Sequence, residues 1–412
     1  MDTPNGSDAP VETDGSVRGD TPIRADASFG TVPSAAIRDG RATDAYFHNT
    51  VAALEHAGRN PHVVAEVTAD QFPDGEFEVF TGVVEAARLL EGRDVDVDAL
   101  GDGRCFDGGP VMRIEGPYLE FAALETSLLG LLSQPSGFAT AALECRLAAP
   151  EATVLSFGAR HVHPAIAAVV ERAALVAGLD GFSHVAAGEL LGREASGTMP
   201  HALVFAFGEG NQVDAWRAFD EAVPDDVPRI ALTDTFWDEV AESLLAAETL
   251  GDSLDGVRLD TTGSRRGDFE HIVREVRWEL DVHGHAAVDI FCSGGLGPQT
   301  LAELRDVVDG FGVGSAITSA DPVDFALDIV AVDGEPVSKR GKLSGVKSVY
   351  RTVDGGHHVA LADGDAPTDA TSLLEPLLRG GEIVREQLDD LDAAGERCLA
   401  DAELVGFGSI DH

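Results

Sequence analysis

Two glycine-rich loops near the end of the chain have the composition of a phosphate site. Each follows a short apolar run and precedes a helical pattern. The loops consist of Ser293, Gly294 and Gly295, and of Gly312, Gly314 and Ser315. Glycine lets backbone amides approach an anion closely, and the start of a helix adds a favourable dipole. Either loop alone is typical of a simple chain reversal, but two consecutive loops at strand ends favour a phosphate site.

Two aspartates end apolar runs whose other side chains should be buried. Asp234 follows the run at 229–232, and Asp260 follows the run at 257–259. Such a carboxylate either caps a helix or binds a divalent cation or a sugar hydroxyl. Capping suits Asp234 by itself, because a helical pattern starts beside it. Two carboxylates at the ends of different strands at one rim favour binding of Mg²⁺ and of ribose hydroxyls.

Basic residues are few and gather at particular places. Arg160 and Arg258 lie near these acids and suit anion binding, with structural ion pairing as the alternative. All three lysines of the chain lie within 338–351, a stretch without acids, which suits a polyphosphate substrate. For Lys339 and Lys342 the alternative is pairing with the acidic C-terminal segment.

Histidines give weaker signals. The pairs at 161/163 and 283/285 could ligate a metal, but no third ligand stands at motif spacing, so no protein-held metal is expected. His201, which follows Pro200, is unremarkable on its own. The four cysteines form no CxxC pair, so we expect neither zinc nor a disulfide framework.

A repeating pattern of apolar run, polar corner and helix begins at Thr153 and should position these residues. The runs lie at 154–157, 182–185, 203–207, 229–232, 257–259, 288–292 and 310–313. The expected helices lie at 164–177, 235–250, 268–281, 298–308 and 322–329. This alternation predicts parallel strands with helical crossovers. We interpret it as an irregular or incomplete α/β barrel, with an open sheet as the alternative, and function at the carboxyl ends of the strands.

The rest of the chain divides around this barrel, which we place at 126–329. Residues 1–28 are acidic and rich in turn formers, which predicts disorder. Residues 29–125 mix strand and helix patterns of an α/β sandwich, to which 330–365 returns. Residues 366–412 suggest a tail of helix and loop.

Overall composition excludes several classes of partner. The chain has 412 residues and a formal net charge of −43, which argues against binding nucleic acid or an anionic membrane. Hydrophobic residues make up 44% of the chain, enough for a core. We interpret the acidity as adaptation to high salt rather than to a cationic partner. A cytoplasmic protein is expected, since no run reaches the roughly 20 apolar residues of a membrane span.

In their order and spacing, the segments that follow the apolar runs resemble those of the nicotinate phosphoribosyltransferases, a family within the type II phosphoribosyltransferase group. The matching pieces are ATDAYF (42–47), ETSLLGLLSQPSGFATAA (125–142), SFGARHVHP, SGTMPHAL, LTDTF, VRLDTTGSRRGD, FCSGGLG, FGVGSAI and the basic stretch ending VYR. Coverage is roughly residues 30–352. The resemblance implies a sandwich domain on an irregular barrel, and a homodimer in which one subunit's sandwich covers its partner's barrel mouth.

The implied reaction joins nicotinate to 5-phosphoribosyl 1-pyrophosphate, giving nicotinate mononucleotide and pyrophosphate, with Mg²⁺ near Asp234 and Asp260 and ATP as a co-substrate. His201 matches the histidine that ATP-coupled members phosphorylate. The resemblance assigns substrate binding to Tyr46 (from the partner subunit), Phe157, Arg160, Thr198 and Arg258. It assigns phosphate binding to the two glycine loops.

Three alternatives remain. Quinolinate phosphoribosyltransferase needs extra cations for a second carboxylate and no phosphorylatable histidine, and the GTMPH corner argues against it. A sugar-phosphate aldolase or isomerase barrel would need a lysine or glutamate at a strand end, yet every lysine lies past the barrel. A non-catalytic acidic binding protein leaves the rim residues unexplained. The sequence departs from the family at Ser156, where a glutamate is frequent, and at Pro200.

Overall fold

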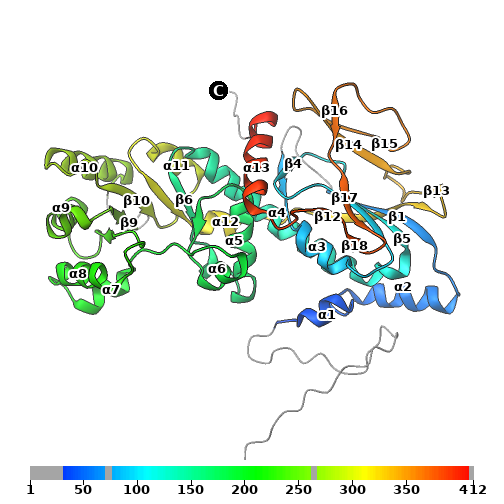
Figure 1. Cartoon of the computed structure of the whole chain (residues 1–412), viewed down its shortest axis with the longest axis horizontal. Helices are drawn as coiled ribbons and strands as arrows, with labels where there is room; N and C mark the ends of the chain where they lie inside the picture. The colour runs from blue at the N-terminus through cyan, green and yellow to red at the C-terminus, as the bar shows by residue number, and fades with distance from the viewer. Residues whose placement is uncertain (1–30, 70–76, 261–266, 408–412) are drawn as a thin grey trace, which may run out of the picture.

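The computed structural model describes residues 31–69, 77–260 and 267–407. The predicted disorder of 1–28 and most of the loop after Asp260 lie outside these residues. Two lobes flank the long helix α4 (Glu125–Ala148) and the C-terminal helix α13 (Leu391–Val405), as Figure 1 shows. One lobe is built on a parallel sheet and the other on antiparallel sheets.

The antiparallel lobe is organised by a seven-stranded sheet in the order β13-β12-β1-β5-β3-β17-β18. Its strands are β1 (His62–Ala69), β3 (Asp96–Ala99), β5 (Pro110–Pro117), β12 (Phe325–Val332), β13 (Glu335–Pro336), β17 (Glu375–Arg379) and β18 (Glu382–Ile383). Smaller sheets pair β2 (Glu78–Phe80) with β4 (Arg104–Phe106), and β14 (Lys347–Thr352) with β15 (His357–Leu361) and β16 (Ala370–Ser372). Chain from both sides of the parallel lobe therefore builds this lobe.

Apolar burial explains the helices of this lobe. The helices are α1 (Ser34–Arg38), α2 (Ala45–His56) and α3 (Val83–Leu90). In α3 six of the eight residues are buried, which matches its apolar sequence VVEAARLL. Removing so much apolar surface from water stabilises the lobe. The segment 366–412, expected as helix and loop, supplies β16, β17 and β18 as well as α13.

The parallel lobe carries six strands in the order β7-β6-β11-β10-β9-β8. They are β6 (Thr153–Ser156), β7 (Gly181–Phe182), β8 (Ile230–Leu232), β9 (Gly256–Leu259), β10 (Asp289–Ser293) and β11 (Gly310–Val313). The helices are α5 (Ala167–Val176), α6 (Val185–Leu191), α7 (His201–Phe207), α8 (Gln212–Ala222), α9 (Glu239–Leu250), α10 (Phe269–Val282), α11 (Pro298–Leu304) and α12 (Ser315–Thr318). The α/β class is thus confirmed, but β7 and β8 do not pair in the described part of the chain, so no barrel closes there.

Two predicted elements have the wrong type. The run at 203–207 forms helix α7 instead of a strand, because a short apolar run fits either structure. The expected helix at 322–329 is largely strand β12, which pairs along β1 from Phe325 to Val332. Pairing between distant segments decides this second case, which local pattern could not reveal.

No helix among the described residues is long and apolar enough to cross a membrane.

Candidate active site

A cavity of about 590 Å³ opens at the carboxyl ends of the parallel strands. Loops after five of the six strands supply its walls, and only the loop after β8 is missing from the lining. The lining residues are Phe157, Ala159, Arg160, His161, Ser183, His184, Gly197, Thr198, Arg258, Asp260, Ser293, Gly294, Gly295, Gly312, Gly314 and Ser315. Eleven of these were selected from the sequence: Phe157, Arg160, Thr198, Arg258, Asp260 and all six residues of the glycine loops.

The glycine loops are held so close to neighbouring chain that side chains would not fit. At Gly294, whose φ is +96°, an added Cβ would lie 2.1 Å from the carbonyl oxygen of Asp260. At Gly312 it would lie 2.4 Å from the Phe157 ring. Glycine is therefore required at these positions by packing, and the same packing places the loop backbones on the cavity wall.

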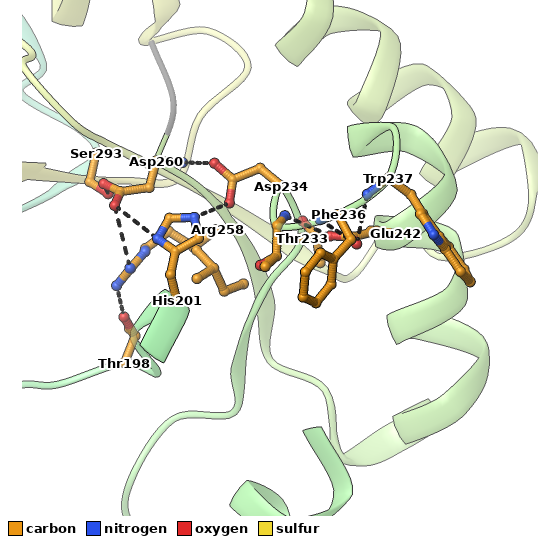
Figure 2. A network of polar contacts seen from close by, with 12 residues as sticks. Thr198, His201, Thr233, Asp234, Phe236, Trp237, Glu242, Arg258, Asp260 and Ser293 are labelled. Carbon is orange, nitrogen blue, oxygen red and sulfur yellow. Dashed lines mark hydrogen bonds and ion pairs between the residues drawn. The ribbon is translucent and has the colours of Figure 1, made fainter. Parts of the chain in front are cut away.

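Asp234 follows β8 and contacts both His201 and Asp260 (Figure 2). Its Oδ1 lies 3.0 Å from Nε2 of His201, and its Oδ2 accepts the backbone N–H of Asp260 at 2.7 Å. The Asp234 side chain is 1% exposed. The cap of α9 is Asp238 rather than Asp234, so the capping alternative is wrong. Asp234 instead holds His201 and Asp260 in place.

Asp260 presents its carboxylate to the cavity. The Ser293 hydroxyl donates a hydrogen bond to it, and Nδ1 of His201 lies 3.7 Å from its Oδ2. A guanidinium nitrogen of Arg258 lies 3.9 Å from the same oxygen. This arrangement leaves a partly exposed acid among donors, as a sugar hydroxyl or a cation-bearing phosphate requires.

The two arginines provide positive charge on the cavity wall. Arg258 donates a hydrogen bond to the Thr198 hydroxyl. Burial lowers the pKa of the Arg258 guanidinium, and the negative charges of Asp260 and Asp234 act in the opposite direction. Within the described part of the chain, no ion pair joins Arg160 to an acid. Structural ion pairing therefore does not explain Arg160, and a guanidinium of this kind suits an anionic ligand.

Five selected residues lie away from the cavity lining. His201 and Asp234 stand behind Asp260, as described above. Tyr46 lies on α2 in the antiparallel lobe, 58% exposed, with its hydroxyl bonded to Asp44 at 3.2 Å. Lys342 pairs with Asp328 at 3.6 Å, and Lys339 is exposed beside it in sequence. Neither lysine borders the cavity of its own chain.

Sequence reasoning missed His184 and gave His161 only a metal-binding alternative. Both line the cavity. The Nδ1 of His184 accepts the backbone N–H of Ala187 at 3.1 Å, so the ring is fixed and its proton resides on Nε2. A signal existed: His184 follows the apolar run of β7, and polar residues after parallel strands meet at one edge.

The fold and the cavity together define an α/β protein whose strand-end cavity is lined by two glycine loops and two arginines. The family model of the quinolinate phosphoribosyl transferase N-terminal domain matches residues 44–136, and that of its C-terminal domain matches 138–328. The structure of nicotinate-nucleotide pyrophosphorylase from Pyrococcus furiosus is 48% identical, with a TM-score of 0.87, and the match covers 92% of this chain and 99% of that one. The chain therefore belongs to the quinolinate phosphoribosyl transferase family.

Two further comparisons concern proteins named for nicotinate. Nicotinate phosphoribosyltransferase pncB2 of Mycobacterium tuberculosis is 32% identical over 317 residues, a match that covers 73% of this chain and 66% of that protein. Human nicotinic acid phosphoribosyltransferase has a TM-score of 0.72 at 22% identity, over 87% of this chain and 94% of that one, which shows a shared fold.

These comparisons correct the predicted activity. The sequence favoured an ATP-coupled nicotinate phosphoribosyltransferase, but the family models of both domains and the 48% identical structure favour the quinolinate alternative. The objection to that alternative was the GTMPH corner with His201, but in the structure His201 is bonded to Asp234 and does not line the cavity. Both alternatives belong to one class of enzyme, and the chain is a phosphoribosyltransferase of NAD metabolism.

Proposed function

We propose that this protein is a quinolinate phosphoribosyltransferase, which forms nicotinate nucleotide and pyrophosphate from quinolinate and 5-phosphoribosyl 1-pyrophosphate. The observation that carries the proposal is the match of both domains, in order, to the quinolinate family models. Quinolinate has two carboxylates and nicotinate nucleotide has one, so the reaction also releases CO₂. The proposal needs no ATP.

The cavity supports a dicarboxylate substrate. Arg160 and Arg258 supply two fixed positive charges, and Nε2 of His184 can donate a hydrogen bond. His161 adds a fourth group that can donate to an anion. Phe157 offers an aromatic surface on the same wall for the pyridine ring.

Other residues of the cavity wall suit the phosphoribosyl group. The backbones of the two glycine loops fit a phosphate, and Asp260 fits the ribose hydroxyls. Displacement of pyrophosphate at the anomeric carbon builds positive charge on the sugar, so charge placement matters more than a protein nucleophile. In this proposal the Asp260 carboxylate stabilises such charge.

Mg²⁺ would be held mainly by substrate oxygens. Among the described residues, no three His, Cys, Asp or Glu side chains form a metal site. Asp260 is the fitting protein ligand, since Asp234 already serves His201 and a backbone amide. When bound, the ion would neutralise the pyrophosphate leaving group.

A homodimer is part of the proposal. Tyr46 is 58% exposed and Lys339 is exposed, and neither has a role in its own chain's cavity. We expect both to contribute to the partner's site.

The test is a substrate comparison at high KCl. Purified protein receives quinolinate or nicotinate with 5-phosphoribosyl 1-pyrophosphate and Mg²⁺, with and without ATP, and pyrophosphate and CO₂ are measured. We expect equal release of both with quinolinate and no need for ATP. Pyrophosphate release with nicotinate but not quinolinate would overturn the proposal.

A further inference from the structure

A buried glutamate outside the cavity holds the loop that carries Asp234. Glu242 lies in the first turn of α9 and is 0% exposed. Its hydrogen-bond partners among the described residues do not line the cavity, and the sequence gave no reason to select it. Figure 2 shows its carboxylate beside the backbone of the loop after β8.

The Glu242 carboxylate accepts hydrogen bonds from three consecutive backbone amides. The N–H of Thr235 reaches Oε2 at 2.9 Å, and those of Phe236 and Trp237 reach Oε1 at 3.1 Å each. The side-chain amide of Gln212 donates to Oε1 at 3.0 Å. Four donors converge on two oxygens, so the site demands a group that only accepts.

The other end of the same loop is also fixed. The N–H of Thr233 donates to the carbonyl of Arg258 at 3.1 Å, and the Ser243 hydroxyl donates to the Thr233 hydroxyl at 3.0 Å. Asp234 therefore stands between two anchored points. Its own carboxylate then fixes His201 and the backbone of Asp260.

We propose that Glu242 is a positioning residue for catalysis, which acts through the 235–237 backbone on Asp234 and, through Asp234, on Asp260 and His201. Glu242 touches no substrate. It sets the geometry of the ribose side of the cavity, while Phe157, Arg160 and His161 on the pyridine side belong to the separate loop after β6. The kinetic part of this inference rests on the proposed function.

The test uses Glu242→Gln, which keeps shape but turns an amide NH₂ toward one of the four donors. We expect kcat to fall by roughly tenfold to a hundredfold, because small displacements at a reacting centre are costly. The KM for the pyridine substrate should change by less than about threefold, since its wall is not anchored by Glu242. A purely structural residue would lower the yield of folded protein without this split.

Hydrogen exchange supplies a readout that does not depend on the substrate. In Glu242→Gln the amides of 235–237 should exchange roughly tenfold faster or more, with little change in β9 or β10. Glu248→Gln is the matched control, because Glu248 is exposed on the same helix, and it should leave both readouts unchanged. If the wild type lacks activity with every pyridine carboxylate, the proposed function fails while exchange still tests the anchor.

A second variant covers the case in which Glu242→Gln does not fold. Gln212→Met removes one donor, leaves the three backbone bonds and should raise exchange at 235–237 by a smaller factor. Wild-type kcat together with wild-type exchange in Glu242→Gln overturns the inference. If only Gln212→Met folds, unchanged amide exchange at 235–237 in that variant also overturns the inference.

Discussion

Asp234 connects the side chain of His201 with the backbone of Asp260, and its amide variant tests that connection. In Asp234→Asn an NH₂ group would face either His201 or the Asp260 backbone, where the carboxylate now accepts. Losing one charge-assisted hydrogen bond costs about 1.5–3 kcal/mol, so kcat/KM should fall by roughly tenfold or more. Steady-state pyrophosphate release measures the loss. Asp238→Asn in the same loop is the control, because asparagine also caps helices, and equal losses in both variants would refute a special role for Asp234.

Glu171 predicts a pH-dependent stability. It is fully buried on α5, and burial raises the pKa of its carboxyl to about 7, against a smaller opposing effect of Ser156. The folded state therefore keeps a proton that the unfolded state loses above its ordinary pKa of 4.5, so stability falls as pH rises between these values. Glu171→Gln should be more stable than wild type by at most about 3 kcal/mol near pH 8, and near equal at about pH 4.5.

Urea unfolding of both proteins across this pH range measures the effect. A constant difference between Glu171→Gln and wild type at every pH would show that the pKa of the carboxyl is the same in the folded and unfolded states. The position is informative because Ser156 begins the turn to Phe157 on the cavity wall.

At the level of single residues, the sequence predicted most of those that follow strands, His184 excepted, and missed the buried Glu242. Asp260 and the glycine loops end apolar runs, and that position alone brings them to the cavity. Glu242 instead contacts the segment that precedes its own helix, and nothing in its helical pattern distinguishes it from a surface acid. The partners of a buried acid are set by tertiary packing, which local spacing does not encode.

The loop after β10 gives a prediction for an element. Gly294→Ala places a Cβ 2.1 Å from the Asp260 carbonyl oxygen at a φ of +96°, so the loop and the end of β9 must separate. Binding of 5-phosphoribosyl 1-pyrophosphate should weaken by roughly tenfold or more, measured by calorimetry. Gly297→Ala in the same loop meets nothing within 4 Å and is the control. Equal affinities of the two variants would show that the loop does not bind the phosphate.

Elements were predictable where local pattern and final pairing agree. The limits of α3 and β11 follow directly from their apolar runs. Strand β12 was mistaken for a helix because the strand with which it pairs, β1, lies about 260 residues earlier in the chain. The open edge between β7 and β8 was also beyond the pattern, since alternating strands and helices are shared by barrels and open sheets.

Across the whole molecule, arginines separate into structural and cavity groups. Arg385 donates to backbone carbonyls. Arg229 and Arg146 also donate to backbone carbonyls, and they pair with Asp220 at 3.0 Å and with Asp180 at 2.6 Å. Arg160 and Arg258 instead face the cavity. In a chain of net charge −43, this contrast concentrates accessible positive charge where anionic substrates would bind.

The same net charge predicts that the folded state gains stability with salt. Repulsion among surface acids opposes the compact state, and it is screened within about 3 Å at 1 M salt against about 10 Å at 0.1 M. The melting temperature should therefore rise by several degrees or more from ~0.1 M to ~2 M KCl, measured by calorimetry. Repeating the series near pH 4.5, where part of the carboxylates are protonated, should shrink the rise. A flat or falling melting temperature at about pH 7 would contradict adaptation to salt and favour a cationic partner for the acidic surface.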